Sequence, residues 1–233
     1  MTTNAARQEL VHEPVYSTIE SALEAFSRGE FLVVSDDEDR ENEGDLVIAA
    51  QFADTQAINF MITEGRGLVC ISITPEHAAR LDLQPMVTCN EDHHGTAFTV
   101  SVDAGLEYGV TTGISAHDRA ETIRVMLAPA APPSALRRPG HLFPLVARAG
   151  GIRERQGHTE AAVELARLAG LAPAGVIVEI INEDGTMSRQ PDLAVFARKH
   201  GIKFITIRAL QEYVEATTPN PRYEVTDDAY VLA

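Results

Sequence analysis

The sequence is poor in cysteine and in basic residues. Two cysteines, Cys70 and Cys89, cannot build a dense disulfide framework, so a reducing cytoplasm is the expected compartment. Lysine and arginine number 19 against 34 acidic residues, and the net charge of −15 argues against binding nucleic acid or anionic lipid, which both need a basic face. No apolar stretch is long enough to span a bilayer, and the N-terminus lacks the apolar core of a signal peptide. The sequence therefore predicts a soluble protein that binds neither nucleic acid nor membrane.

Apolar runs typical of strands alternate with amphipathic helical segments along the 233 residues. Strands are expected at 31–35, 46–50, 68–73, 98–102, 176–181 and 204–207. Helices are expected to begin at a capping box starting at Ser17, at Thr55 and at Thr74, and to include 123–127, 158–169, 191–201 and 210–214. The proline-rich stretch 128–139 is interpreted as a long connection, because composition does not change across it.

No regular βαβ period forces a doubly wound sheet. The sequence predicts an α+β (mixed α/β) fold, in which helices flank a mixed β-sheet as a layered sandwich. A single domain is expected over residues 1–233, with its core at about 17–214 and with irregular terminal segments on either side.

Residues 36–45 hold seven carboxylates and one arginine directly after the apolar run 31–34. A charge run is usually a solvated surface. At the end of a buried strand, however, packed like charges destabilise the fold unless a cation or a set of donors compensates them. Carboxylate oxygens suit Mg²⁺ or Mn²⁺, and Arg40 suits a sugar hydroxyl or a phosphate. An EF-hand is excluded, because Asn42 occupies its glycine position.

A second candidate site is the segment 153–159, where a loop enters a helix. Backbone N–H groups at a helix N-terminus favour an anion, and Gly157 lets the anion approach them. Arg155 adds a planar set of donors, and Thr159 adds a hydroxyl that either caps the helix or bonds a phosphate oxygen. The alternative is a capped helix with two solvated arginines, in which His158 is an ordinary packed or solvated side chain.

Two isolated residues are further candidates. His141 precedes an apolar pair, and its simplest interpretation is an ordinary loop histidine. Glu179 interrupts the apolar strand 176–181. Because charged residues are almost never fully buried without a partner, this carboxylate either faces solvent or lines a site, where it is a candidate general acid or base.

Taken together, these segments resemble 3,4-dihydroxy-2-butanone 4-phosphate synthase, an enzyme family of riboflavin biosynthesis. The matching segments run in family order over roughly residues 17–214 and are 36–50, 65–70, 109–119, 138–145, 155–162 and 182–187. Several are long and polar, which makes coincidence a poor explanation. Many relatives carry a fused GTP cyclohydrolase II domain with a cysteine zinc site. This chain has neither the length nor the cysteines for that domain, so it resembles the free-standing form.

The resemblance implies a lyase that converts D-ribulose 5-phosphate to L-3,4-dihydroxy-2-butanone 4-phosphate and formate, with Mg²⁺ (or Mn²⁺) as cofactor. It also implies a homodimer with sites at the subunit interface. It assigns the metal to Glu41 and His158, and acid/base roles to His141 and Glu179. The substrate-binding residues that it implies are Arg40, Glu41, Asp45, Arg155, Gln156, Gly157, His158, Thr159 and Glu179. The parts played by Cys70 and Thr112 stay open.

This assignment fits the chemistry, because enolisation next to a ketone needs a base and a Lewis acid. Loss of water, skeletal rearrangement and loss of C4 then require further proton transfers. Two other functions stay open: a non-catalytic module that binds a divalent ion and an anion, and a metal-dependent sugar-phosphate isomerase. Neither explains the carboxylate within an apolar strand, and neither cleaves a carbon–carbon bond, so formate release distinguishes the three.

Overall fold

The computed structural model of the protein describes residues 16–218. Within that range one mixed sheet has the strand order β4-β5-β3-β6-β2-β1-β7. The strands are β1 (Leu32–Ser35), β2 (Gly44–Ala49), β3 (Cys70–Ile73), β4 (Val102–Ala104), β5 (Leu136–Val146), β6 (Ala174–Glu179) and β7 (Lys203–Thr206). The helices are α1 (Ile19–Ser27), α2 (Thr55–Phe60), α3 (Pro75–Arg80), α4 (Ala116–Leu127), α5 (His158–Leu168), α6 (Gln190–His200) and α7 (Ile207–Thr217). The pairs β1-β7 and β3-β5 are parallel, and the other pairs are antiparallel.

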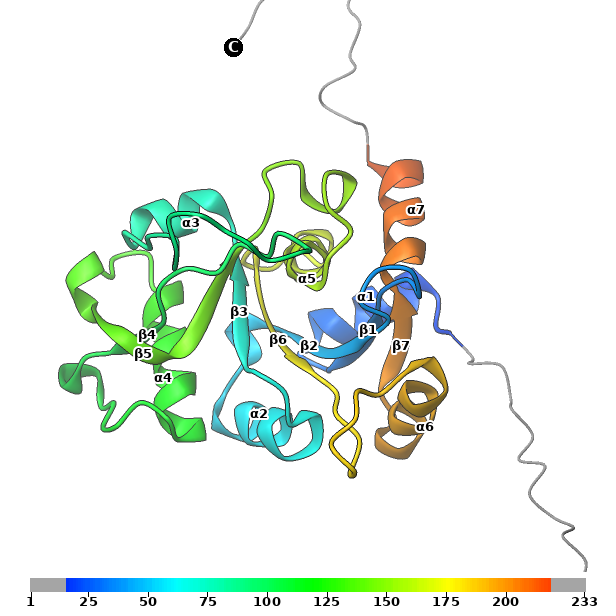
Figure 1. Cartoon of the computed structure of the whole chain (residues 1–233), viewed down its shortest axis with the longest axis horizontal. Coiled ribbons are helices and arrows are strands. Elements are labelled where there is room, and N and C mark those ends of the chain that lie inside the picture. Colours follow the sequence, from blue (N-terminus) through cyan, green and yellow to red (C-terminus); the bar gives the residue numbers. More distant parts are fainter. Residues whose placement is uncertain (1–15, 219–233) are drawn as a thin grey trace, which may run out of the picture.

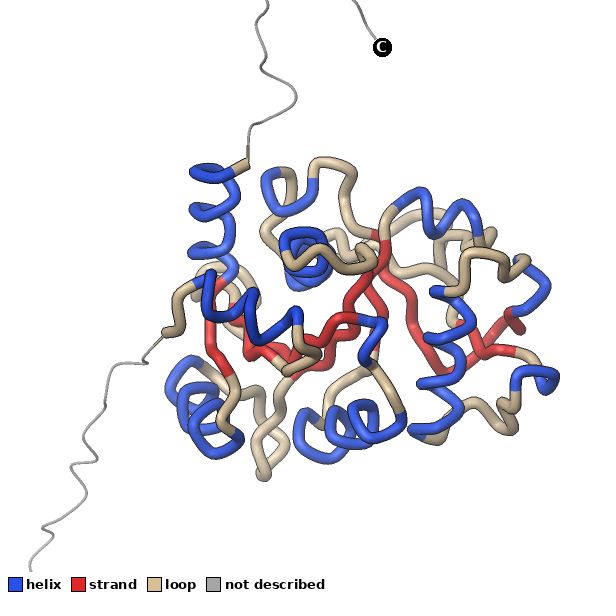
Figure 2. Tube along the Cα trace, turned by 180° about the vertical axis from the view of Figure 1, so that it is seen from behind, coloured by secondary structure: helices blue, strands red, loops and turns tan. Residues whose placement is uncertain are grey.

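Helices cover both faces of the sheet (Figure 1), and the strands lie between them when the molecule is seen from behind (Figure 2). Successive side chains of a strand point to opposite faces. In β1, Leu32 and Val34 therefore join the apolar core beneath α1, α5 and α7, whereas Val33 joins the core beneath α2, α4 and α6. Two cores enclose one sheet, which confirms the predicted mixed α/β fold with a layered arrangement.

Two predicted helix caps are wrong by one residue. Thr18, rather than Ser17, caps α1, and Asp54, rather than Thr55, caps α2. Each cap accepts a hydrogen bond from the backbone N–H three residues later. Where two capping residues are adjacent, the sequence alone does not decide between them, because both types satisfy the first free N–H groups equally well. The cap predicted at Thr74 is confirmed.

The strand predicted at 98–102 is wrong. Phe98 and Thr99 form only isolated bridges, and β4 begins at Val102. The N–H of Thr99 donates to a carbonyl of β5, whereas the N–H of Val100 donates to the carbonyl of Gln84. The segment therefore divides its hydrogen bonds between two neighbours and forms no continuous ladder, although its sequence alternates as a strand does.

The connection predicted at 128–139 ends earlier than expected, because β5 begins at Leu136. His141 consequently belongs to a strand, and its interpretation as a loop histidine is wrong. In the described part of the chain, no helix has the length and apolarity to cross a membrane. Most of the terminal segments predicted to be irregular lies outside residues 16–218, but residues 215–217 continue α7 and are helical. The single-domain extent of 1–233 stays a prediction.

Candidate active site

Most of the predicted site residues gather at one end of the central strands, where β2 begins and β6 ends. Because these strands are antiparallel neighbours, Asp45 and Glu179 are direct cross-strand partners. Cys70, at the start of β3, pairs with Ile177 on the other side of β6. With the start of α5, these strand ends enclose a cavity of about 220 Å³. Its lining includes the predicted residues Arg40, Glu41, Asp45, Arg155, His158, Thr159 and Glu179.

Three predicted residues are absent from this lining. Gln156 lines an adjoining hollow of about 370 Å³, which shares Arg40 with the cavity. Gly157 is the N-cap residue of α5. His141 is absent from the lining of the cavity and contacts Asp103 instead. The described structure thus unites the acidic loop, the helix start and Glu179, and separates His141 from them.

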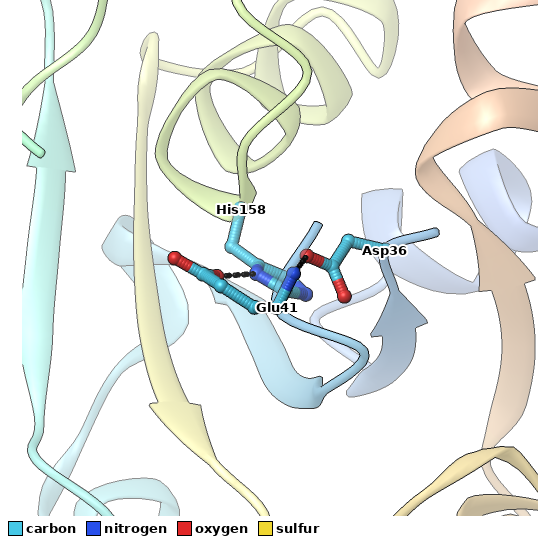
Figure 3. Close-up of side chains that lie close together, drawn as sticks. All are labelled: Asp36, Glu41 and His158. Atoms are coloured by element: carbon cyan, nitrogen blue, oxygen red, sulfur yellow. Dashed lines mark hydrogen bonds and ion pairs between the residues drawn. The ribbon is translucent and has the colours of Figure 1, made fainter. Parts of the chain in front are cut away.

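Asp36 shapes the acidic loop. One oxygen of its buried carboxylate accepts from the N–H of Glu41 at 3.0 Å and from Nη1 of Arg40 at 2.8 Å, and the other accepts from the N–H of Glu43 at 2.8 Å. Ligand atoms of Asp36, Glu41 and His158 lie within 4.8 Å of one another (Figure 3). The donors of the loop already occupy most acceptor positions of Asp36. The better candidates for holding a cation are therefore Glu41 and His158.

His158 is buried, with 6% of its surface exposed. Its Nε2 lies 3.1 Å from the carbonyl oxygen of Val34, and its Nδ1 lies 3.7 Å from a carboxylate oxygen of Glu41 (Figure 3). A carbonyl oxygen only accepts, so Nε2 carries the proton. In the neutral ring, Nδ1 therefore presents its lone pair towards Glu41. An imidazole nitrogen and a carboxylate oxygen facing each other in a buried pocket form a donor set that fits a divalent cation.

The cavity holds a surplus of negative charge. Burial, assisted by the charges of Glu179 and Glu41 and opposed by that of His158, raises the pKa of Asp45 to about 8. Burial disfavours the charged form of His158, but the charge of Asp45 and the carboxylate of Glu41 outweigh it and raise the pKa of His158 to about 9. Burial also disfavours ionised Glu41, but His158 and Arg40 outweigh it and lower its pKa to about 2. Without another cation, protons on His158 and Asp45 compensate the surplus.

In the metal-free protein, stability is expected to fall as the pH rises from about 6.5 to about 9. Folding raises the pKa of His158 from 6.5 to about 9, so its contribution is complete below the lower value and is lost as the pH passes the higher one. Asp45 acts in the same direction between 3.8 and about 8. The loss is on the order of 3 kcal/mol for His158. Thermal unfolding in EDTA measures it, and a His158→Gln variant with an unchanged pH slope would contradict this origin.

The start of α5 is suited to an anion. Its N-cap, Gly157, has no side chain to bond the free N–H groups of the first turn, so Thr159 is not the cap. Arg155 is fixed in place, because its guanidinium bonds Glu160 at 2.6 Å and Thr96 at 3.0 Å. Arg153 donates to the carbonyl of Val214. The alternative of a capped helix with two solvated arginines is therefore wrong.

Glu179 lines the cavity rather than facing bulk solvent. One of its carboxylate oxygens accepts from the N–H of Leu68 at 2.8 Å. Gly67 permits this contact, because a Cβ at that position would collide with the carboxylate of Glu179. Glu179 therefore lines a cavity, and its role as a general acid or base stays a prediction.

The cavity is also lined by Glu43, which the sequence analysis included in the acidic loop but did not single out, and by Asp92 and Phe98, which it missed. Glu41, Glu43 and Asp45 occupy alternate positions leading into β2, and alternate residues of a strand point to the same face. This spacing could have indicated that Glu43 lies beside the other two. No sequence pattern marks Asp92 or Phe98, which reach the cavity from an irregular segment.

Residues 20–213 match the family model described as 3,4-dihydroxy-2-butanone 4-phosphate synthase. The chain is 58% identical over 198 residues to riboflavin biosynthesis protein RibBA of Aquifex aeolicus, which covers 85% of this chain and 49% of that protein. The corresponding protein of Bacillus mycoides is 56% identical over 199 residues, with the same coverage. The chain thus spans about half the length of the curated relatives it matches.

Solved structures give the same picture. A crystal structure of 3,4-dihydroxy-2-butanone 4-phosphate synthase in complex with two magnesium ions superposes with a TM-score of 0.83 and 49% identity, over 87% of this chain and 98% of that one. RibBX, a two-domain 3,4-dihydroxy-2-butanone 4-phosphate synthase from A. baumannii, superposes with a TM-score of 0.82 and 48% identity. The match covers 86% of this chain and 59% of RibBX.

Proposed function

The chain belongs to the 3,4-dihydroxy-2-butanone 4-phosphate synthase family, and from this membership we propose that it converts D-ribulose 5-phosphate to L-3,4-dihydroxy-2-butanone 4-phosphate and formate. The supporting observation is the single cavity in which the acidic loop, the start of α5 and Glu179 converge. The names of the relatives support a step of riboflavin biosynthesis.

A divalent cation, Mg²⁺ or Mn²⁺, is assigned to Glu41 and His158. The support is the lone pair of Nδ1 facing a carboxylate oxygen in a pocket with excess negative charge. A related synthase has been crystallised with two magnesium ions. Bound there, the ion supplies Lewis acidity that stabilises negative charge developing on the substrate's oxygens.

The substrate's phosphate is assigned to the start of α5, where free N–H groups meet Arg155 and Thr159. Gln156 and Gly157 belong to the same turn. Arg40 faces the cavity with its guanidinium held by Asp36 and Glu41, an arrangement that suits sugar hydroxyls. Asp45 lines the cavity as the cross-strand partner of Glu179, where its carboxyl group is placed to hydrogen-bond a substrate hydroxyl.

Glu179 and His141 are the proposed acid/base groups. Glu179 lies in the cavity, where the N–H of Leu68 orients its carboxylate. His141 lies outside the cavity, with 44% of its side chain exposed. An acid/base group placed there serves a site completed by a second subunit, so the active unit is proposed to be a homodimer with sites across its interface. The exposed apolar side chains of Leu106 and Ile114, which flank the loop packed against His141, support a contact surface there.

Incubation with D-ribulose 5-phosphate is expected to release one formate for each substrate consumed. EDTA should abolish this release and Mg²⁺ or Mn²⁺ should restore it, because the carboxylate-rich cavity needs a hard cation. A formate dehydrogenase assay measures formate, and phosphorus NMR follows the organic product. An isomerase or an ion sensor would yield no formate, and undiminished release from metal-free protein would contradict the cation assignment.

The free-standing form and the cytoplasmic location stay predictions. The size of the protein in its source cells would test the first, and its compartment there would test the second.

A further inference from the structure

His141 lies in a bulge of β5. Val102 of β4 pairs with Leu142, whereas the next residue, Asp103, pairs with Arg137. Residues 138–141 are therefore extra residues on β5, opposite a single step of β4. A bulge bends its strand and re-aims the side chains that it carries, and such bulges are frequent beside active sites.

Gly140 allows this bulge to lie directly against β4. A Cβ at position 140 would collide with the backbone of Val102 and Asp103. The N–H of Gly140 donates to the hydroxyl of Ser101 at 3.2 Å. The backbone next to His141 is thus held by its contact with β4 and is independent of the histidine side chain.

The carboxylate of Asp103 contacts both the backbone and the ring of His141. One oxygen accepts from the N–H of His141 at 2.8 Å, and the other lies 2.7 Å from Nδ1. An ionised carboxylate only accepts, so Nδ1 carries the proton and Nε2 is the basic nitrogen. The side chain of Asp103 is 12% exposed and that of His141 is 44% exposed. The contact between Asp103 and Nδ1 is therefore shielded from water, while the rest of the imidazole ring reaches solvent.

A glycine loop covers this contact. Gly113 has a φ of +90°, and a Cβ there would collide with the carboxylate of Asp103 and approach Nδ1 of His141. Asp118 fixes the loop, because it accepts from the N–H of Gly113 and from the hydroxyl of Thr111, both at 2.9 Å.

Two arginines lie on elements next to Asp103. Arg137 is the cross-strand partner of Asp103 and lies 3.7 Å from Glu107. Burial lowers the pKa of Arg119 on α4, and the charge of Asp103 opposes that shift, which indicates a second cation nearby.

We propose that Asp103 is a positioning residue that fixes the tautomer and the orientation of His141, so that Nε2 faces the reacting substrate. This inference rests on the proposed function, in which His141 is an acid/base group. The same division of roles applies wherever a carboxylate orients a catalytic imidazole by accepting from one nitrogen and leaving the other free to exchange protons.

An Asp103→Asn variant tests the proposal. Asparagine keeps the shape of the side chain, but its amide donates to Nδ1 and shifts the ring proton to Nε2. We expect kcat to fall by about 100-fold or more, with little change in KM, because proton transfer is impaired while substrate binding is not. Nitrogen-15 NMR should show the His141 proton on Nδ1 in the wild-type protein and on Nε2 in the variant. A His141→Ala spectrum assigns the signals.

Glu107→Gln is the matched control, because it removes another carboxylate beside β4 that pairs only with Arg137 among the described residues. It should keep the wild-type kcat and tautomer. A fully active His141→Ala variant would overturn the proposed role of His141 and this inference with it. If His141→Ala is inactive but Asp103→Asn has a normal kcat, the role of Asp103 is overturned and that of His141 stands. A wild-type protein with the proton on Nε2 would overturn it whether or not the variant folds.

Discussion

Replacing His158 with alanine is expected to lower formate release by roughly 1,000-fold or more while the protein stays folded. The variant loses Nδ1, the nitrogen donor that faces Glu41, and with it the assigned cation. The cost to stability comes from a small cavity and from the lost pairing of the buried imidazolium with Asp45 and Glu41, together on the order of 3–5 kcal/mol. No helix cap is lost, because Gly157 holds that position. Steady-state assays measure turnover, and calorimetric titration measures Mn²⁺ binding.

His77→Ala is a matched control for this variant. Nε2 of His77 lies 2.8 Å from the carbonyl oxygen of Met126, just as that of His158 lies near a carbonyl in β1. Both changes remove a histidine that bonds a backbone carbonyl, but only His158 lines the cavity. The control should lose less stability, because Arg80 still donates to the carbonyl of Met126, and it should keep its turnover and Mn²⁺ binding. A His158→Ala protein with wild-type Mn²⁺ binding and turnover would return His158 to the status of a packed side chain.

The part of the fold that sequence predicts well is the centre of the sheet. Strands β1, β2 and β6 are buried on both faces and therefore appear in the sequence as continuous apolar runs. The wrong strand predictions lie near the edge of the sheet formed by β4 and β5. The segment from Phe98 to Val102 alternates as a strand does, but its hydrogen bonds go to two different neighbours. The start of β5 carries Pro139 and follows three further prolines, so the sequence indicates a connection there until the partner strand β4 is known.

The candidate site was predicted where its residues cluster locally. The acidic loop and the start of α5 each hold several unusual residues within one short segment. The structural role of Asp36 within the acidic loop, and Asp103 altogether, were missed for the opposite reason. Asp36 acts through backbone N–H groups that only the folded loop brings to it, and Asp103 meets His141 across 38 positions of sequence. Neither contact leaves a local pattern.

Mixing His141→Ala subunits with His158→Ala subunits is expected to restore activity that neither variant has alone. His158 lines the cavity of its own subunit, and His141 stands outside that cavity on β5. If His141 serves the partner's cavity, one of the two sites in a mixed dimer receives both intact residues and the other receives neither. Random exchange then restores about a quarter of the wild-type sites, because half of the dimers are mixed. Formate release after subunit exchange measures the recovery, and two affinity tags isolate the mixed dimer.

The control mixes His158→Ala with Glu41→Gln. These residues face each other within one cavity at 3.7 Å, so every site in such a dimer lacks one of them and no activity should return. Recovery in the first mixture and none in the control requires that His141 and His158 act at the same site from different subunits. The shared site is contradicted if the purified mixed dimer of His141→Ala and His158→Ala is inactive. It is equally contradicted if sedimentation shows a fully active monomer at low concentration, since a monomer has no partner to supply His141.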